Sequence, residues 1–196
     1  MPRTVEFMFD VGSPTAYLAW AQLPGLVDRT GAEIIYTPIL LGGLFRASGN
    51  PPPIDTPAKS AYILRDCQRF ARRLGVMFKP NPHFPVNTLM IMRAIAGAQR
   101  AGQLEPMLTA AFRAMWIGEQ KLDDPNTLEA LAEQTGIGVS TIAHWIGDET
   151  VKAILRKNTD EAARRGAFGA PTFFVGEEMF FGQDRMDWVE EALLAG

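Results

Sequence analysis

Residues 10–17, Asp10-Val11-Gly12-Ser13-Pro14-Thr15-Ala16-Tyr17, organise the rest of the chain. Residues 4–9 before them alternate apolar with more polar side chains, which predicts a strand. Apolar residues then recur at helical intervals over residues 17–27, which predicts one helix after the strand. Ser13 stands at the N-cap of that helix and Pro14 at its first position, where a missing N–H costs nothing. The stretch is therefore the join between a strand and a helix.

Ser13 at this join has two interpretations. Taken alone, a Ser-Pro pair at a helix start most simply caps the helix. A helix N-terminus also presents unpaired N–H groups and the positive end of the helix dipole, which together attract an anion. A hydroxyl in the same place could donate a hydrogen bond to a bound thiolate. The two roles are compatible with each other.

Composition excludes several classes of function. The 196 residues suffice for one domain, or for one domain with a large insertion. A net charge of -3 leaves no excess of Lys and Arg, so nucleic acid is not expected as a partner. No apolar run reaches the length of a membrane-spanning helix. The first strand contains Glu6 and lacks the apolar core of a signal peptide, so we expect a cytoplasmic protein that binds no membrane.

Cysteine and histidine usage excludes disulfide and zinc chemistry. Cys67 is the only cysteine, so the chain has neither an intrachain disulfide nor a dithiol motif. It falls in a predicted helix, where a buried, small apolar role is expected. With one cysteine and two histidines, His83 and His144, no metal site is predicted. Both histidines are interpreted as structural.

The remaining pattern predicts a sheet built from the two ends of the chain. Residues 33–38 read as a second strand, which gives a βαβ unit with parallel strands. Glycine and proline over residues 41–57 predict an extended, exposed connection. Helical periodicity follows up to residue 165, and arginines in its first helix are interpreted as a solvated face. Residues 168–181 then predict a hairpin of two strands, followed by a last amphipathic helix.

This βαβ…ββα order, with a functional residue at the first helix start and a proline opening the third strand, resembles a thioredoxin-like fold. The inserted helices resemble the DsbA-like branch, which also contains the kappa glutathione transferases. The resemblance implies an α/β fold with residues 1–50 and 166–196 as the thioredoxin-like domain and residues 51–165 as a helical insertion domain. Ser13-Pro14-Thr15-Ala16 stands where thioredoxins have Cys-x-x-Cys, which excludes thiol–disulfide exchange and points to the glutathione-using relatives.

Residues 9–19, 168–174 and 182–186 resemble, more closely, the 2-hydroxychromene-2-carboxylate isomerases. Kappa-class glutathione transferases share these motifs in looser form. The resemblance implies a homodimeric, glutathione-dependent isomerase that interconverts 2-hydroxychromene-2-carboxylate and trans-o-hydroxybenzylidenepyruvate in bacterial aromatic (naphthalene-type) catabolism. The alternatives are a kappa-like glutathione transferase and a non-catalytic glutathione-binding relative.

The resemblance also implies a glutathione site. Ser13 would be the catalytic residue at the glutathione sulfur, with its hydroxyl stabilising the thiolate. The peptide between Ala170 and Pro171 would be cis and would present the backbone of Ala170 to the cysteinyl part of glutathione. The γ-glutamyl end would be received by a short segment before the last helix: Gly182, Gln183 and Asp184.

The resemblance implies further contact residues for glutathione and for the substrate. Asn50 and Lys59 would contact glutathione, with Lys59 paired to its glycyl carboxylate. The substrate side would be lined by residues from two connections, namely Phe45, Arg46, Asn87 and Thr88, with Arg46 facing the substrate carboxylate. The chain departs from the family at Phe180-Phe181, where a tryptophan pair is common, and at Gln183, where Asn or Ser is common.

Overall fold

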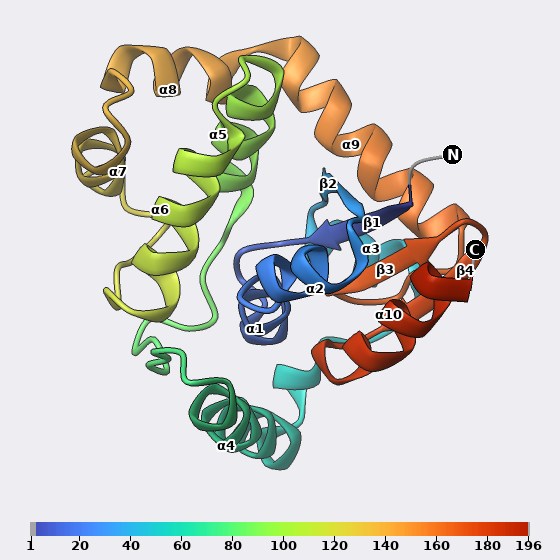
Figure 1. Ribbon diagram of the computed structural model, residues 1–196. Coiled ribbons are helices and arrows are strands. Elements are labelled where there is room, and N and C mark those ends of the chain that lie inside the picture. Colours follow the sequence, from blue (N-terminus) through green and yellow to red (C-terminus); the bar gives the residue numbers. More distant parts are fainter. Residues whose placement is uncertain (1–2, 196) are drawn as a thin grey trace.

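Four strands form one mixed sheet in the order β2-β1-β3-β4 (Figure 1), in a computed structural model that describes residues 3–195. β1 (Thr4–Phe9) runs parallel to β2 (Glu33–Pro38) and antiparallel to β3 (Thr172–Val175). β3 continues through a hairpin into β4 (Glu178–Phe181). The predicted α/β, thioredoxin-like fold, with a sheet built from both ends of the chain, is therefore confirmed.

Helices surround this sheet, and the segment between β2 and β3 is mainly helical (Figure 1). They are α1 Pro14–Trp20, α2 Leu23–Thr30, α3 Leu41–Ser48, α4 Pro57–Leu74, α5 Leu89–Arg100, α6 Leu104–Trp116, α7 Thr127–Thr135, α8 Val139–Gly147, α9 Glu149–Arg164 and α10 Met186–Ala195, with short 3-10 turns at Pro53–Asp55 and Gln183–Arg185. None of the helices between residues 3 and 195 is both long and apolar enough to cross a bilayer.

The single helix predicted after Ser13 is wrong, because the structure divides it into α1 and α2. α1 ends at Trp20, four residues before Pro24. Proline has no N–H to donate to the carbonyl of Trp20, so a continuous helix would lose that hydrogen bond. Gly31 then ends α2 with a φ of +67°, a left-handed conformation that glycine adopts without strain.

The extended connection predicted over residues 41–57 is wrong for its first part, because residues 41–48 form α3. Two distant residues make this helix possible. The Asp10 carboxylate accepts a hydrogen bond from Leu41 N at 2.8 Å and so pairs an N–H at the helix start. A Cβ at Gly43 would lie 3.1 Å from Thr159 Cγ2, so glycine lets α3 lie close to α9. Tertiary contacts therefore override the low helix propensity of glycine.

The two faces of the sheet are buried under different helices. Phe7 stacks on Phe9 and on Phe173, with ring centroids 5.1 and 5.2 Å apart. These rings belong to the core that α1, α2, α5, α6 and α10 complete. On the opposite face, Met8 and Phe174 pack with buried residues of α3 and α9.

The main core continues without a break from the sheet into the helices of residues 51–165. Phe112 of α6, for example, stacks on Trp20 of α1 with ring centroids 5.2 Å apart. The division into a thioredoxin-like domain and an insertion domain stays a prediction. The continuous core packs helices of residues 51–165 against the sheet and against α1, which begins beside the end of β1.

Candidate active site

Ser13 lies directly before α1 at the N-cap position, and its hydroxyl oxygen caps the helix. Oγ accepts a hydrogen bond from Ala16 N at 3.1 Å, and Pro14 occupies the first turn, as the sequence predicts. Ser13 is only 4% exposed. Because α1 has seven residues, it aligns fewer peptide dipoles than the longer helix predicted from the sequence. Stabilisation of an anion here therefore depends more on directed hydrogen bonds than on the helix dipole.

The Ala170-Pro171 peptide lies against Ser13 and is cis, as the resemblance implies. Ser13 Oγ donates a hydrogen bond to the carbonyl oxygen of Ala170 at 2.8 Å. Thr15 Oγ1 lies 3.2 Å from the same carbonyl oxygen and 3.0 Å from Ser13 Oγ. Two hydroxyls and one carbonyl thus meet in what we call the Ser13 cluster (Ser13, Thr15 and Ala170). The sequence interpretation did not single out Thr15, whose only signal is its place two residues after Ser13.

A cavity of about 510 Å³ opens beside the Ser13 cluster. This volume lies in the range of pockets that hold small molecules and cofactors. Its wall is formed by the connection after β1, by α3, by one side of α4 and by the segments that precede α5, β3 and α10. The predicted site residues that line it are Ser13, Phe45, Asn50, Thr88, Ala170, Gly182, Gln183 and Asp184.

Four predicted site residues are absent from this wall. Arg46 and Lys59 are exposed on α3 and α4. Asn87 is also exposed, and its side-chain oxygen accepts a hydrogen bond from Leu89 N at 3.0 Å, at the start of α5. Pro171 is buried behind Ala170, and its carbonyl accepts a hydrogen bond from Gly182 N at 3.0 Å. The roles predicted for all these side chains stay predictions.

The segment before α10 has a defined conformation. Gly182 has a φ of +102°, and a Cβ there would lie 2.6 Å from Asp184 Oδ1, so only glycine fits this approach of carboxylate to backbone. Gln22 Nε2 donates to Gln183 O at 3.2 Å and to Gln183 Oε1 at 3.3 Å. Asp184 pairs with Arg185 and still lines the cavity. Its carboxylate can therefore accept a hydrogen bond from a bound ammonium group.

Asp10 is a site residue that the sequence interpretation missed. It is 1% exposed and lines the cavity. Its carboxylate accepts hydrogen bonds from Gly12 N at 2.9 Å, Leu41 N at 2.8 Å and Thr88 Oγ1 at 3.0 Å. Burial raises the pKa of Asp10, while these hydrogen bonds act in the opposite direction. The carboxylate ties together the connection after β1, the start of α3 and the start of α5.

The rest of the cavity wall is mainly apolar. Its aromatic side chains and its Leu, Ile and Val side chains are Leu41, Phe45, Ile54, Ile63, Leu64, Phe70, Phe84, Val86 and Phe181. The charged residues among its described lining are Asp10, Asp66 and Asp184, with no Lys, Arg or His. A conjugated aromatic molecule can pack against such a wall. A carboxylate buried there would have no cation to pair with, which is costly.

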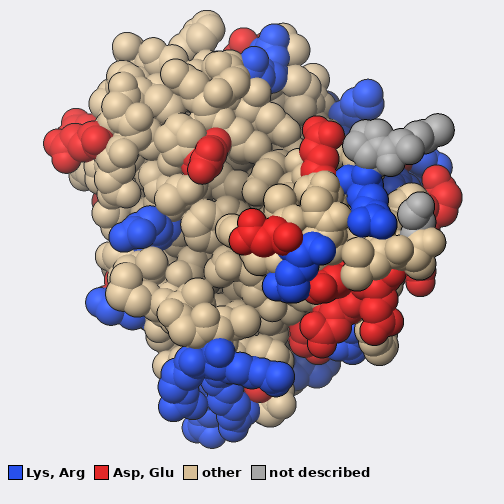
Figure 2. All heavy atoms as spheres, in the orientation of Figure 1, with Lys and Arg blue, Asp and Glu red and all other residues tan. Residues whose placement is uncertain are grey.

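Cationic side chains instead gather over the outer side of α4 (Figure 2). The residues concerned, all exposed, are Arg65, Arg69, Arg72 and Arg73. Arg69 pairs with Asp66 at 3.3 Å across one helical turn. The exposure of these arginines agrees with their interpretation as a solvated face.

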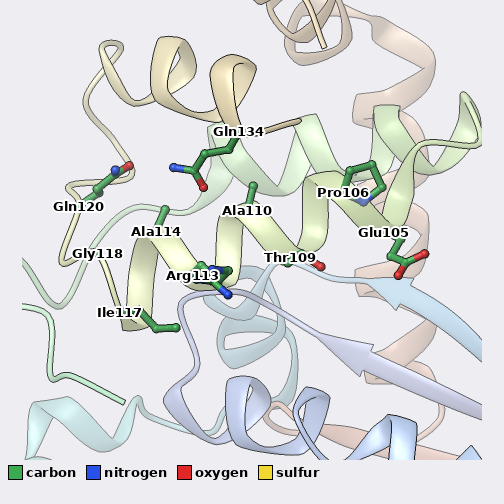
Figure 3. A pocket seen from close by; sticks show the side chains of 10 residues that line it. All are labelled: Glu105, Pro106, Thr109, Ala110, Arg113, Ala114, Ile117, Gly118, Gln120 and Gln134. Carbon is green, nitrogen blue, oxygen red and sulfur yellow. The ribbon is translucent and has the colours of Figure 1, made fainter. Parts of the chain in front are cut away.

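A second cavity, of about 690 Å³, runs along α6 and reaches α7 (Figure 3). Arg113, Gln120 and Gln134 supply polar groups to its wall. None of the predicted site residues lines it. The buried side-chain oxygen of Gln120 has no hydrogen-bond partner among the described residues. This cavity is therefore separate from the Ser13 cluster.

Cys67 and His83 lie outside the wall of the Ser13 cavity as well. Cys67 is 2% exposed on α4, and burial raises the pKa of its thiol to about 12. Such a thiol stays protonated and unreactive near neutral pH, which agrees with its predicted apolar role. His83 is exposed, and its backbone N–H donates to Asn81 Oδ1 at 2.8 Å in the loop before α5.

Comparisons with known proteins extend over nearly the whole chain. A family model described as a DSBA-like thioredoxin domain matches residues 4–194. The chain is 33% identical to a 2-hydroxychromene-2-carboxylate isomerase of Sphingobium xenophagum, over 99% of this chain and 100% of that protein. It is 30% identical to glutathione S-transferase kappa 1 of Homo sapiens, over 98% of this chain and 92% of that protein.

The fold agrees with these sequence relationships. A solved structure of a 2-hydroxychromene-2-carboxylate isomerase superposes with a TM-score of 0.87 at 28% identity, covering 97% of this chain and 94% of that one. The chain therefore belongs to the DsbA-like thioredoxin domain family and, within it, to the family of 2-hydroxychromene-2-carboxylate isomerases and their kappa-class relatives.

Proposed function

We propose that this chain, an isomerase of that family, binds glutathione in the 510 Å³ cavity and uses it to isomerise a conjugated aromatic substrate. The substrate pair proposed is 2-hydroxychromene-2-carboxylate and trans-o-hydroxybenzylidenepyruvate, in bacterial aromatic catabolism. The observation that carries the proposal is the Ser13 hydroxyl, placed on the cavity wall beside the cis Ala170-Pro171 peptide. A cytoplasmic location and a homodimeric state complete the proposal and stay predictions.

The residues on the cavity wall fit glutathione. When bound, glutathione supplies a thiolate nucleophile that can add reversibly to a conjugated substrate. Ser13 would hold the sulfur and favour its ionised form, because a free thiol with a pKa of about 8.5 is mostly protonated near neutral pH. Asp184 would accept a hydrogen bond from the γ-glutamyl ammonium. Backbone N–H groups at the start of the adjoining helix would receive the neighbouring carboxylate.

The apolar part of the wall would position the aromatic ring. Phe45, Phe84 and Phe181 offer aromatic faces and edges for packing, and their contact excludes water from the reacting carbon. The substrate carboxylate would stay hydrated at the mouth of the cavity, because no cation lines the described part of the wall. The pairing of this carboxylate with Arg46 that the resemblance implies stays a prediction.

An ultraviolet assay of the interconversion, with and without glutathione, tests the proposal. We expect turnover that depends on glutathione and leaves the total free thiol unchanged, because the cofactor is recycled. Full activity without any thiol would refute the mechanism. Glutathione binding by calorimetry without turnover of any electrophile would instead support a non-catalytic relative.

A second candidate function is a kappa-like transferase that conjugates glutathione to an electrophile. The cation-free, apolar wall favours it, because an uncharged electrophile would lose little hydration on entering. Loss of free thiol with chlorodinitrobenzene, together with no chromene isomerisation, would support this function over the first. Recycling of glutathione with the chromene substrate would exclude it as the main reaction.

A further inference from the structure

The proposed substrate carries a carboxylate, and the described wall of the 510 Å³ cavity offers it no cation. Two carboxylates of that wall, however, have cationic partners just outside it. Asp184 pairs with Arg185 at the place proposed for the γ-glutamyl end of glutathione. Asp66 pairs with Arg69 on α4, with Arg69 Nη1 3.3 Å from Asp66 Oδ1. The Asp66–Arg69 pair has no role in the glutathione site proposed above.

The side of α4 that faces the cavity borders the side that carries the arginines. Ile63, Asp66 and Phe70 recur at helical intervals and line the cavity. Asp66 belongs to both sides, because it lines the cavity while its side chain is still 33% exposed. Arg69 follows one turn later, and its side chain is 56% exposed. Its guanidinium therefore lies at the mouth of the cavity.

Two neighbours on α4 hold the Arg69 guanidinium in this place. Its Cζ lies 5.9 Å from the centre of the Tyr62 ring, and Nη1 donates a hydrogen bond to Asp66. Among residues 3–195, Asp66 is the only hydrogen-bond acceptor of Arg69, so most of its N–H groups are left for a ligand or water. An exposed ion pair of this kind is weak. A substrate carboxylate can therefore join or replace Asp66 as the acceptor.

We propose that Arg69 is a specificity-determining residue that binds the substrate carboxylate at the mouth of the cavity, an inference that rests on the proposed function. The aromatic ring enters the cavity beside Phe70, and the carboxylate stays outside, where it keeps part of its hydration. Lys59, the predicted partner of the glycyl carboxylate, lies about 15 Å from Arg69 along the axis of α4, at about 1.5 Å per residue. The two carboxylates therefore do not compete for one cation. Arg69 thereby favours a carboxylate substrate over the uncharged electrophiles that the apolar wall would also accept.

The experiment compares Arg69→Gln with Arg73→Gln, which removes an exposed arginine of the same helix that does not pair with a described residue of the cavity wall. The ultraviolet assay at saturating glutathione uses 2-hydroxychromene-2-carboxylate and its methyl ester, the ester as substrate or as competitive inhibitor. We expect Arg69→Gln to raise KM for the acid about three- to tenfold, with kcat and the affinity for the ester unchanged. Arg73→Gln should change KM less than about twofold, because its charge is screened by salt. Asp66→Asn should lower KM for the acid, because it frees Arg69 from its present partner.

The outcomes separate this inference from the proposed function. No turnover of the acid by the wild type with glutathione would refute the proposed function and the inference with it. Wild-type turnover together with an unchanged KM in Arg69→Gln would refute the role of Arg69 alone. Equal losses for acid and ester would show a packing role, and equal losses in Arg69→Gln and Arg73→Gln would show only a diffuse field; either result overturns the inference. Weaker glutathione binding by Arg69→Gln in calorimetry would assign Arg69 to the cofactor and overturn it as well.

Discussion

Replacing Ser13 by alanine separates its structural role from its chemical role. The structural loss comprises the cap on Ala16 N at 3.1 Å and the hydrogen bond to Ala170 O at 2.8 Å. Losing an N-cap costs about 1 kcal/mol of the free energy of unfolding, and Thr15 remains as a donor to the carbonyl. We therefore expect Ser13→Ala to fold, with a loss of about 1–2 kcal/mol.

The expected loss of activity is larger. A hydrogen bond to a charged group contributes about 1.5–3 kcal/mol, and each 1.36 kcal/mol corresponds to a tenfold rate change. Ser13→Ala should thus lower kcat/KM for glutathione-dependent isomerisation by about 10- to 150-fold. Initial rates with saturating substrate and varied glutathione give this value, and urea unfolding gives the stability.

Asp148→Ala is the matched control. Asp148 caps α9 by accepting hydrogen bonds from Thr150 N at 2.6 Å and Val151 N at 3.1 Å, and it does not line the Ser13 cavity. This variant should lose stability and keep wild-type kcat/KM. If Ser13→Ala behaved the same way, with reduced stability and unchanged kcat/KM, Ser13 would be a helix cap only and the chemical role would be refuted.

Three further predictions concern packing and titration. Gly97→Ala should lower the free energy of unfolding, measured by urea unfolding, by about 1–3 kcal/mol, because the new Cβ would lie 2.4 Å from Trp145 Cβ. Gly147→Ala is the control and should leave this free energy unchanged, because nothing lies within 4 Å of its new Cβ. The Cys67 thiol, with a pKa of about 12, should react with a disulfide reagent at pH 8 only after unfolding, and rapid labelling of the native protein would contradict its burial. The pKa of Asp10 is raised above its ordinary value of 3.8, so the folded state holds the carboxyl proton more tightly than the unfolded state does. The free energy of unfolding should therefore fall as pH rises from 3.8 through the raised pKa. Carbon NMR of the Asp10 carboxyl measures this pKa, and a titration midpoint at or below 3.8 would contradict the prediction.

The sheet could be predicted from the sequence because its signals are local. Alternating side chains mark β1 and β2, and the hairpin of β3 and β4 has its turn at Gly176-Glu177. α3 could not be predicted in this way, because the groups that favour it are distant. Asp10 pairs an N–H at its start, and Thr159 contacts its glycine. The break between α1 and α2 did have a local signal, since Pro24 removes a backbone donor.

The features of the candidate site that depend on backbone conformation could be predicted. The position of Ser13 at the cap follows from a short motif, whereas the cis Ala170-Pro171 peptide was implied by the family resemblance. Side-chain direction on a helix is harder to predict, because successive residues point about 100° apart. Phe45 of α3 therefore lines the cavity while Arg46 beside it is exposed.

The same limit applies on α4, where Ser60 lines the cavity and Lys59 does not. Thr15 and Asp10 were missed for a different reason. Their contacts join segments up to 155 residues apart, namely Ala170 for Thr15 and Leu41 and Thr88 for Asp10. No local pattern encodes such contacts, so only the folded chain shows them.

A crystal structure of the complex with glutathione tests the central claim most directly. We predict that the sulfur lies in the 510 Å³ cavity within hydrogen-bond distance of Ser13 Oγ, with the γ-glutamyl end near Asp184. Glutathione bound outside this cavity, or bound within it with its sulfur beyond reach of Ser13, would contradict the account.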